Sequence, residues 1–95
     1  MHIITQKALR EFAASHPDVE SALQHWYQLM KHGNFQTLVE VKAIFPSADQ
    51  VDDFTVFNIG GNKVRLITNI RYNRQKVYIV AVLTHAEYNK NKWRE

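Results

Sequence analysis

The stretch FTVFNIGGNKVRLITNIRY, residues Phe54 to Tyr72, decides the fold. Apolar and polar residues alternate on both sides of the Gly-Gly-Asn at positions 60–62, which is typical of two antiparallel strands joined by a tight turn. Because alternate residues of a strand share a face, Arg65 and Arg71 project to one side of the second strand. Apolar or uncharged residues occupy the other side. The stretch therefore predicts a hairpin with one apolar face and one basic face.

A third strand and a short helix are expected after the hairpin. Residues 73–75 form a turn, and residues 76–84 are almost continuously apolar, as in a central strand that is covered on both faces. Thr84 and Glu87 match the reciprocal capping pair that starts a helix. On the other side of the hairpin, residues 49–53 are acidic and are expected to form a loop. The three strands together predict an antiparallel meander.

The N-terminal half is predicted to be helical after a short strand at residues 2–4. Thr5 is expected to cap a first helix, and Pro17 to start a second at its first position. The second helix ends at Gly33 and Asn34. Thr37 with Glu40 predicts the start of a third short helix that closes at Pro46. The second helix is expected to bury a stripe of four residues, Val19, Leu23, Trp26 and Met30, so Trp26 is expected to be a core residue.

These elements predict an α+β fold of one domain over residues 1–95, in which two to three helices pack on one face of the sheet and leave the other partly open. The chain has no cysteine, which excludes disulfides, thiolate catalysis and cysteine-ligated zinc. No segment approaches the roughly 18 apolar residues of a membrane span, so we expect no membrane association. The expected location is the cytoplasm.

Charge is distributed unevenly although the formal net charge is only +3. Residues 1–62 contain four Lys or Arg and seven Asp or Glu, whereas residues 63–95 contain eight Lys or Arg and two Glu. An anionic partner is therefore expected on the C-terminal half. The cations expected to contact RNA, in addition to any in the active site, are Lys63, Arg71, Arg74, Lys76 and Lys90.

A candidate active site lies where the basic strand face meets the turn after Thr84. His85 and Tyr88 are three residues apart and share a face of a helical turn, and Arg65 projects from the strand. These groups suit RNA cleavage by its own 2′-hydroxyl, which needs a base, an acid and a cation that stabilises charge developing on the phosphate. No histidine or carboxylate spacing predicts a metal site, so neither a metal nor another cofactor is expected.

Other interpretations remain open at the sequence level. His85 can be an exposed turn residue, Tyr88 can pack against Trp93, and the strand arginines can be solvated or paired with aspartates. The protein can then be a nonenzymatic RNA-binding or ribosome-binding module that uses Tyr72, Tyr78 and Tyr88 for stacking. A third possibility is a protein-interaction domain that accepts a partner at the open sheet face or edge.

A resemblance to a known family favours the first interpretation. Residues 2–4 (HII), 41–49 (VKAIFPSAD), 56–67 (VFNIGGNKVRLI) and 84–88 (THAEY) resemble HigB-type toxins, the RelE-like toxic components of bacterial type II toxin-antitoxin systems. The resemblance implies a RelE-like fold and an endoribonuclease that cuts mRNA during translation, on the ribosome. It also implies a HigA-type helix-turn-helix antitoxin as partner. Arg65, His85 and Tyr88 match motif positions, whereas Asn89 stands where the family pattern leads us to expect Asp.

Overall fold

The computed structural model describes residues 1–61 and 63–94, and within them the chain has an α+β fold. The sheet has five strands in the order β1-β5-β4-β3-β2; β1 is parallel to β5, and the other pairs are antiparallel. The strands are β1 (His2–Ile4), β2 (Asp49–Val51), β3 (Phe54–Ile59), β4 (Val64–Arg71) and β5 (Lys76–Thr84). The helices are α1 (Gln6–Ser15), α2 (Glu20–His32), α3 (Leu38–Ile44) and α4 (His85–Asn89), with 3₁₀ turns η1 (Pro17–Val19), η2 (Tyr72–Arg74) and η3 (Lys92–Arg94).

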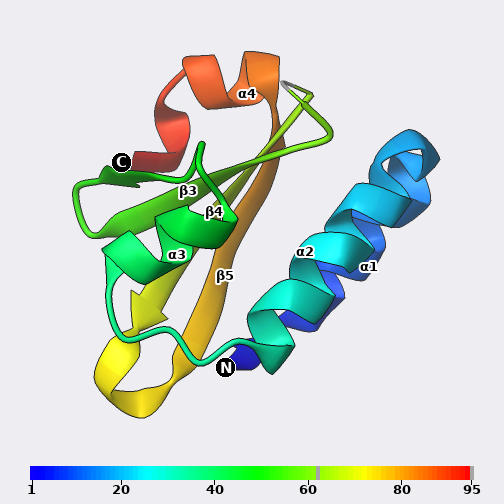
Figure 1. The fold of residues 1–95 in the computed structure, drawn as a ribbon. Coiled ribbons are helices and arrows are strands. Elements are labelled where there is room, and N and C mark those ends of the chain that lie inside the picture. The colour runs from blue at the N-terminus through cyan, green and yellow to red at the C-terminus, as the bar shows by residue number, and fades with distance from the viewer. Residues whose placement is uncertain (62, 95) are drawn as a thin grey trace.

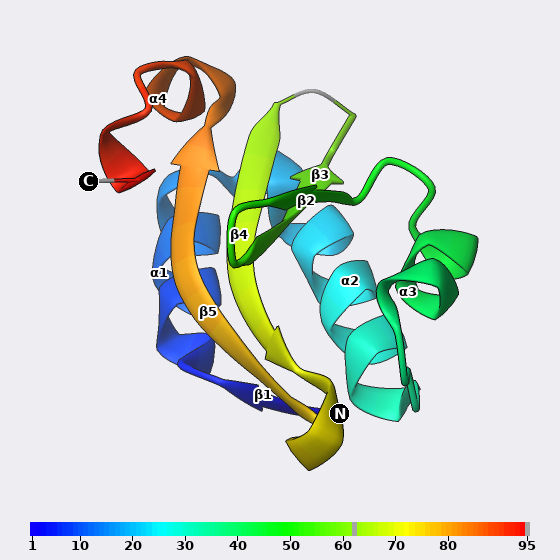
Figure 2. The same cartoon turned by 90° about the vertical axis from the view of Figure 1, so that its left-hand side faces the viewer.

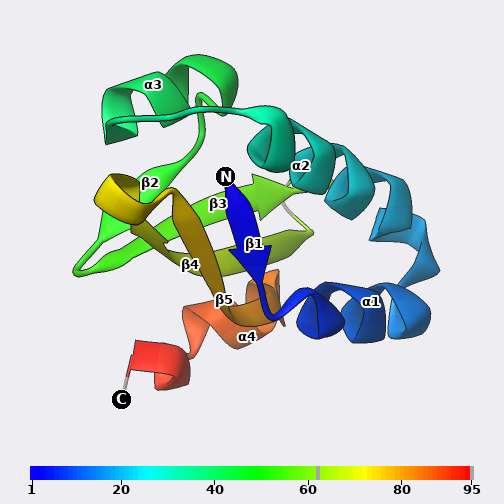
Figure 3. The ribbon, with the colours of Figure 1, turned by 90° about the horizontal axis from the view of Figure 1, so that it is seen from below.

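The two faces of the sheet have different coverings. Helices α2 and α3 lie on one side of the strands, whereas α4 and the C-terminal turn lie on the other side (Figure 3). Helix α1 runs beside α2 (Figure 1), and β1 and β2 are the two edges of the sheet (Figure 2). The core between α2 and the sheet contains Trp26, Met30, Phe57 and Leu66, each at most 1% exposed. The chain therefore closes its main core with helices and leaves the second face to its C-terminal residues.

The helical predictions are confirmed in their pattern and corrected at two ends. The stripe of Val19, Leu23, Trp26 and Met30 is buried, as its spacing predicts. Thr5, however, adopts a left-handed conformation (φ 74°) and its side chain makes no capping hydrogen bond. Pro17 starts η1 rather than an α-helix, and α2 begins at Glu20. Thr37 does cap α3, because its hydroxyl accepts from the Glu40 N–H at 3.3 Å.

The predicted hairpin is present as β3 and β4, with Gly60 (φ 63°) and Gly61 (φ 73°) in the left-handed conformation that the turn requires. Asn62, the third predicted turn residue, lies outside the described residues. The expectation of a loop at residues 49–53 is wrong for its first three residues, because Asp49–Val51 forms β2 and pairs with β3. Aspartate has a low strand propensity, so this segment is a strand because β3 provides partners for its backbone hydrogen bonds.

The expectation that β5 is covered on both faces is also wrong. Val77 and Ile79 are buried towards α2, but Tyr78 is 36% and Val80 45% exposed. The register of β4 with β5 shifts between Ile67 and Thr68, which leaves Val80 between the pairs Ile67–Ala81 and Thr68–Ile79.

Among the described residues, no helix is both long enough and apolar enough to cross a bilayer.

Two valines of α3 offer a matched test of the core. We expect Val41→Ala to lower the free energy of unfolding by about 1–3 kcal/mol, because Val41 is fully buried and its methyl groups leave a cavity. Val39→Ala removes the same groups from a side chain that is 78% exposed and should be neutral or slightly stabilising. Urea denaturation of both variants measures the difference. Equal losses of stability would contradict the packing of α3 on the core.

Candidate active site

Arg65 lies on the face of β4 that points away from α2 and α3. It pairs across the sheet with Asn58 of β3 and Leu83 of β5. Its neighbours on this face, Val56 and Ile67, are 3% and 0% exposed, and Arg65 itself is only 9% exposed. This end of the face, expected to be open, is therefore covered. The cover is the chain that follows β5.

Helix α4 starts at a capping box that joins it rigidly to β5. The Thr84 hydroxyl accepts from the Glu87 N–H at 3.2 Å, and the Thr84 N–H donates to the Glu87 carboxylate at 2.9 Å. The second hydrogen bond, with a smaller effect of the Thr84 hydroxyl, lowers the pKa of Glu87. Because the pKa is lowered on folding, this stabilisation is complete at neutral pH and is lost only as the pH falls through the pKa of the folded state.

The three predicted catalytic side chains meet at this junction. Arg65 Nη2 lies 2.9 Å from Nδ1 of His85, and the Arg65 guanidinium carbon lies 5.7 Å from the centre of the Tyr88 ring. The His85 N–H also donates to the Lys63 carbonyl at 3.0 Å, which holds the start of α4 against the start of β4. The sequence predicted that these residues share a face, and the fold brings their side chains into contact.

The hydrogen bond between Arg65 and His85 assigns a role to one ring nitrogen. A guanidinium group has only donors, so Nδ1 is the acceptor in this contact. The guanidinium charge lies in a largely buried position, where its interaction with an anion is stronger than in bulk water.

Trp93 belongs to the same cluster and was missed as a site residue. Its ring stacks on Tyr88, with centroids 5.2 Å apart and planes 16° apart, and meets Phe54 edge to face at 5.7 Å. The contact between Tyr88 and Trp93 was considered only as a packing alternative to chemistry. The structure shows that packing and proximity to Arg65 occur together. An isolated tryptophan near the end of the basic segment was the available signal.

The predicted RNA-binding cations are not all near this cluster. Arg71 and Lys76 face each other at the opposite end of the β4–β5 pair, beside η2, which contains Arg74 (Figure 1). At about 3.3 Å per residue, Arg71 lies about 20 Å along β4 from Arg65. Lys63 forms an ion pair with Asp18 at 3.3 Å. Lys90 directly follows α4 and lines the groove beside it.

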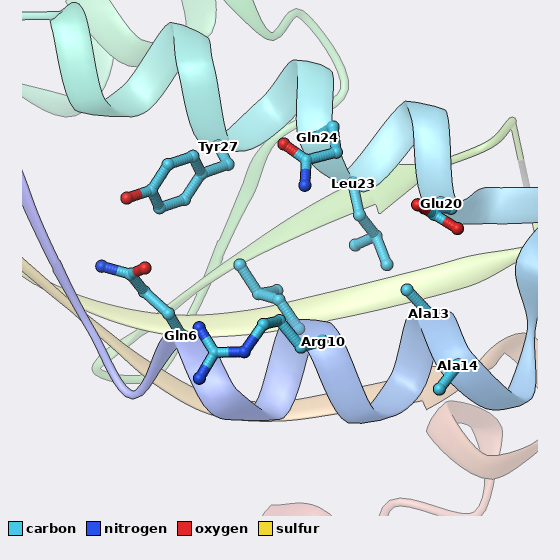
Figure 4. Close-up of a pocket in the computed structure, with 9 residues that line it drawn as sticks. Gln6, Arg10, Ala13, Ala14, Glu20, Leu23, Gln24 and Tyr27 are labelled. Carbon is cyan, nitrogen blue, oxygen red and sulfur yellow. The ribbon is translucent and has the colours of Figure 1, made fainter.

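Two surface grooves border these elements. One, of about 430 Å³, lies beside α4 and is lined by Leu83, Glu87, Lys90, Lys92 and Trp93. The other, of about 410 Å³, lies between α1 and α2 and includes Gln6, Arg10, Glu20, Leu23 and Tyr27 (Figure 4). Neither groove is lined by any of the three predicted catalytic residues. Over residues 1–61 and 63–94, no three His, Asp or Glu side chains gather as metal ligands would.

The tyrosines proposed for a purely binding role do not form one platform. Tyr72 packs against the main core and its hydroxyl is buried, and this burial raises its pKa. Tyr78 is on the face of the sheet opposite to the main core, and Tyr88 is stacked on Trp93. The arrangement instead places a guanidinium, an imidazole and a phenol together at the junction of β4 and α4. Such a set can bind a phosphodiester, move a proton and stabilise added negative charge.

Comparisons with known proteins identify the family of the chain. Residues 19–91 match the family model described as HigB_toxin, RelE-like toxic component of a toxin-antitoxin system. The chain is 39% identical over 92 residues to the mRNA interferase toxin HigB of Escherichia coli K12, which covers 94% of this chain and 88% of that protein. It is equally similar to the mRNA interferase HigB of Shigella flexneri.

A more distant relative, the mRNA interferase HigB of Escherichia coli O6:H1, is 31% identical over 93 residues, or 95% of this chain and 90% of that protein. The family match and these identities extend over α2, α3 and the elements that hold Arg65, His85 and Tyr88, namely β4 and α4. The chain therefore belongs to the HigB family of RelE-like toxins.

Proposed function

We propose that this chain is an mRNA endoribonuclease, the toxin of a toxin-antitoxin pair, and that it cuts RNA without a metal. Its family membership and the names of its relatives, which are mRNA interferases, support the activity. The single observation that carries the mechanism is the contact of Arg65 with His85 at 2.9 Å, beside the Tyr88 ring. In this mechanism one phosphate binds against all three side chains.

Binding of RNA starts the reaction by releasing His85. A phosphate oxygen carries a negative charge and accepts hydrogen bonds from guanidinium more strongly than a neutral imidazole does. The scissile phosphate therefore takes over the Arg65 N–H groups, and Nδ1 of His85 becomes free to accept a proton. In the free protein the contact with Arg65 occupies Nδ1 of His85, and substrate binding makes this nitrogen available as the base.

The chemical step then needs only groups of this cluster. Nδ1 accepts the proton of the 2′-hydroxyl, whose oxygen attacks the adjacent phosphorus while the bond from phosphorus to the 5′ oxygen breaks. The imidazolium returns the proton to the departing 5′ oxygen, so the products are a 2′,3′-cyclic phosphate and a 5′-hydroxyl. Arg65 stabilises the charge that builds on the phosphate. Tyr88 orients the phosphate through its hydroxyl.

The remaining RNA lies along the strand face away from the core. Lys90 contacts the phosphates next to the cut, and Arg71, Arg74 and Lys76 contact phosphates at the far end of the same face. Lys63 adds a contact when RNA replaces Asp18 as its partner. We further propose that the mRNA is cut on the ribosome, in the cytoplasm, and that a HigA-type helix-turn-helix antitoxin neutralises the toxin. Residues 1–95 act as one domain.

Arg65→Lys tests the guanidinium while keeping the charge and most of the stem under Tyr88. We expect the single-turnover rate of RNA cleavage to fall about 10²- to 10³-fold, because lysine offers no planar pair of donors to the phosphate. Arg71→Lys makes the same substitution on the same face of β4 and should leave this rate unchanged. Induced expression of the Arg65 variant should no longer arrest growth. Full toxicity at equal abundance would contradict the role of Arg65.

His85→Gln separates chemistry from binding. The amide keeps a hydrogen-bonding group near Arg65 but does not shuttle a proton, so the rate should fall about 10²- to 10⁴-fold with little change in RNA affinity. Tyr88→Phe keeps the ring contacts and should lower the rate by a smaller factor. His25→Gln, on the exposed side of α2, is the control. A loss of rate that only follows lost affinity would favour a nonenzymatic RNA-binding module.

Salt dependence tests the path of the RNA. On single strands each phosphate contact contributes about −0.7 to the slope of log affinity against log salt. Arg71→Ala and Arg74→Ala should each make the slope shallower by about this amount without changing the rate of the bound complex. The affinity of an RNA that carries a 2′-deoxy nucleotide at the cut site can be measured by fluorescence anisotropy. An unchanged slope in both variants would exclude the far end of the strand face.

A further inference from the structure

Helix α4 carries two of the proposed catalytic residues but is too short to be stable by itself. It has five residues, whereas isolated helices shorter than about 12 residues are marginal in water. Its first turn is fixed by the capping box and by the hydrogen bond from His85 to the Lys63 carbonyl. Tyr88 directly follows Glu87, and its ring takes no part in these contacts. The position of the Tyr88 ring therefore depends on what holds the last turn of α4.

The chain reverses direction directly after α4 and returns to the sheet. Asn91 adopts a left-handed conformation (φ 58°), which asparagine tolerates better than most residues. The reversal brings the Trp93 indole N–H to the Tyr88 carbonyl at 3.2 Å, and the Asn91 N–H reaches the same carbonyl at 3.1 Å. Trp93 is thus a second donor, beside the Asn91 N–H, to a carbonyl at the end of the helix.

Trp93 also connects α4 to the rigid part of the fold. Its ring stacks on Tyr88, and Phe54, which it meets edge to face, is the first residue of β3. Aromatic pairs of this kind contribute about 0.5–1.5 kcal/mol each beyond the area they bury. Phe54, Trp93, Tyr88 and Arg65 form a continuous series of contacts that starts on β3 and ends on β4.

We infer that Trp93 is a positioning residue of the active site: it holds Tyr88 against Arg65 and thereby keeps the guanidinium aimed at the phosphate and at His85. The inference rests on the proposed function. Arg65 is 9% exposed although it lies on a face that α2 and α3 do not cover, and Tyr88 is one of the groups against it. Without the indole, the Tyr88 ring gains rotational freedom and the Arg65 guanidinium becomes more exposed to water.

An alternative role for Trp93 is to stack on an RNA base, because it also lines the groove beside α4. Positioning is favoured because the indole already uses its N–H and its stacking contact within the protein. The two roles predict different kinetics. A positioning residue affects the rate of the bound complex, whereas a stacking platform affects RNA affinity.

The kinetic test compares Trp93→Ala, Trp93→Phe and Val41→Ala. For Trp93→Ala we expect the single-turnover rate at saturating RNA to fall about 10- to 100-fold, since displacing a catalytic group by about 1 Å costs up to about 100-fold. The affinity for the 2′-deoxy RNA should stay nearly constant. Trp93→Phe keeps a stacking ring and should recover most of the rate. Val41→Ala, destabilised in the main core, should cut at the parent rate, which controls for lost stability.

A second measurement does not depend on activity. In the protein labelled with ¹⁵N-arginine, the Arg65 side-chain N–H signals should exchange slowly with water in the parent and in Trp93→Phe. They should exchange fast in Trp93→Ala. Arg65→Lys assigns the signals by their disappearance.

The outcomes separate the inference from the proposed function. Slow exchange of the Arg65 N–H groups in Trp93→Ala would overturn the positioning role, and so would a loss of affinity that accounts for the whole loss of rate. If the parent protein does not cut RNA at all while the exchange results hold, the positioning of Arg65 by Trp93 stands and the proposed ribonuclease function is wrong.

Discussion

The antiparallel pairing of β4 with β5 is the constraint on which the rest of the structure depends. Every other strand adds to one of these two: β3 with β2 to β4, and β1 to β5. Their register also decides the chemistry. A slip of one residue would turn Arg65 into the core and send Leu66 outwards, because neighbouring residues of a strand lie on opposite faces. The pair Val64–Thr84 at one end of this ladder places His85 directly beside the end of β4.

Much of this arrangement could be predicted from the sequence, because it depends on local patterns. Period-two alternation and two glycines specify the β3–β4 hairpin, and Thr84 with Glu87 specifies the start of α4. The stripe on α2 follows from helical periodicity. The common side of Arg65 and His85 does not follow from counting residues, because the register shift at Val80 changes which alternate residues of β5 face the core. The candidate site was therefore predictable as a set of residues, although not as a set of contacts.

The features that sequence reasoning missed depend on distant parts of the chain. Asp49–Val51 becomes a strand only because β3 offers an unpaired edge, and no propensity of the segment itself indicates this. Thr5 fails to cap α1 because its backbone turns left-handed where β1 leaves the sheet. Trp93 finds Phe54 from 39 positions away in the numbering, through a reversal at a single asparagine. Such contacts are set by tertiary packing.

The parallel pairing of β1 with β5 has a consequence for how the protein folds. Ile3 lies opposite Val77, so this pairing joins residues that are far apart in the sequence. The turns of the β3–β4 and β4–β5 hairpins, in contrast, are only a few residues long. Closing a longer loop costs more chain entropy, and we therefore expect β1 to dock last. Until it does, one edge of β5 has free backbone donors and acceptors, next to Tyr78 and Val80, which remain exposed in the finished fold. We therefore expect the newly made chain to pass through an interval in which β5 is open to pairing with another polypeptide, and docking of β1 to end that interval.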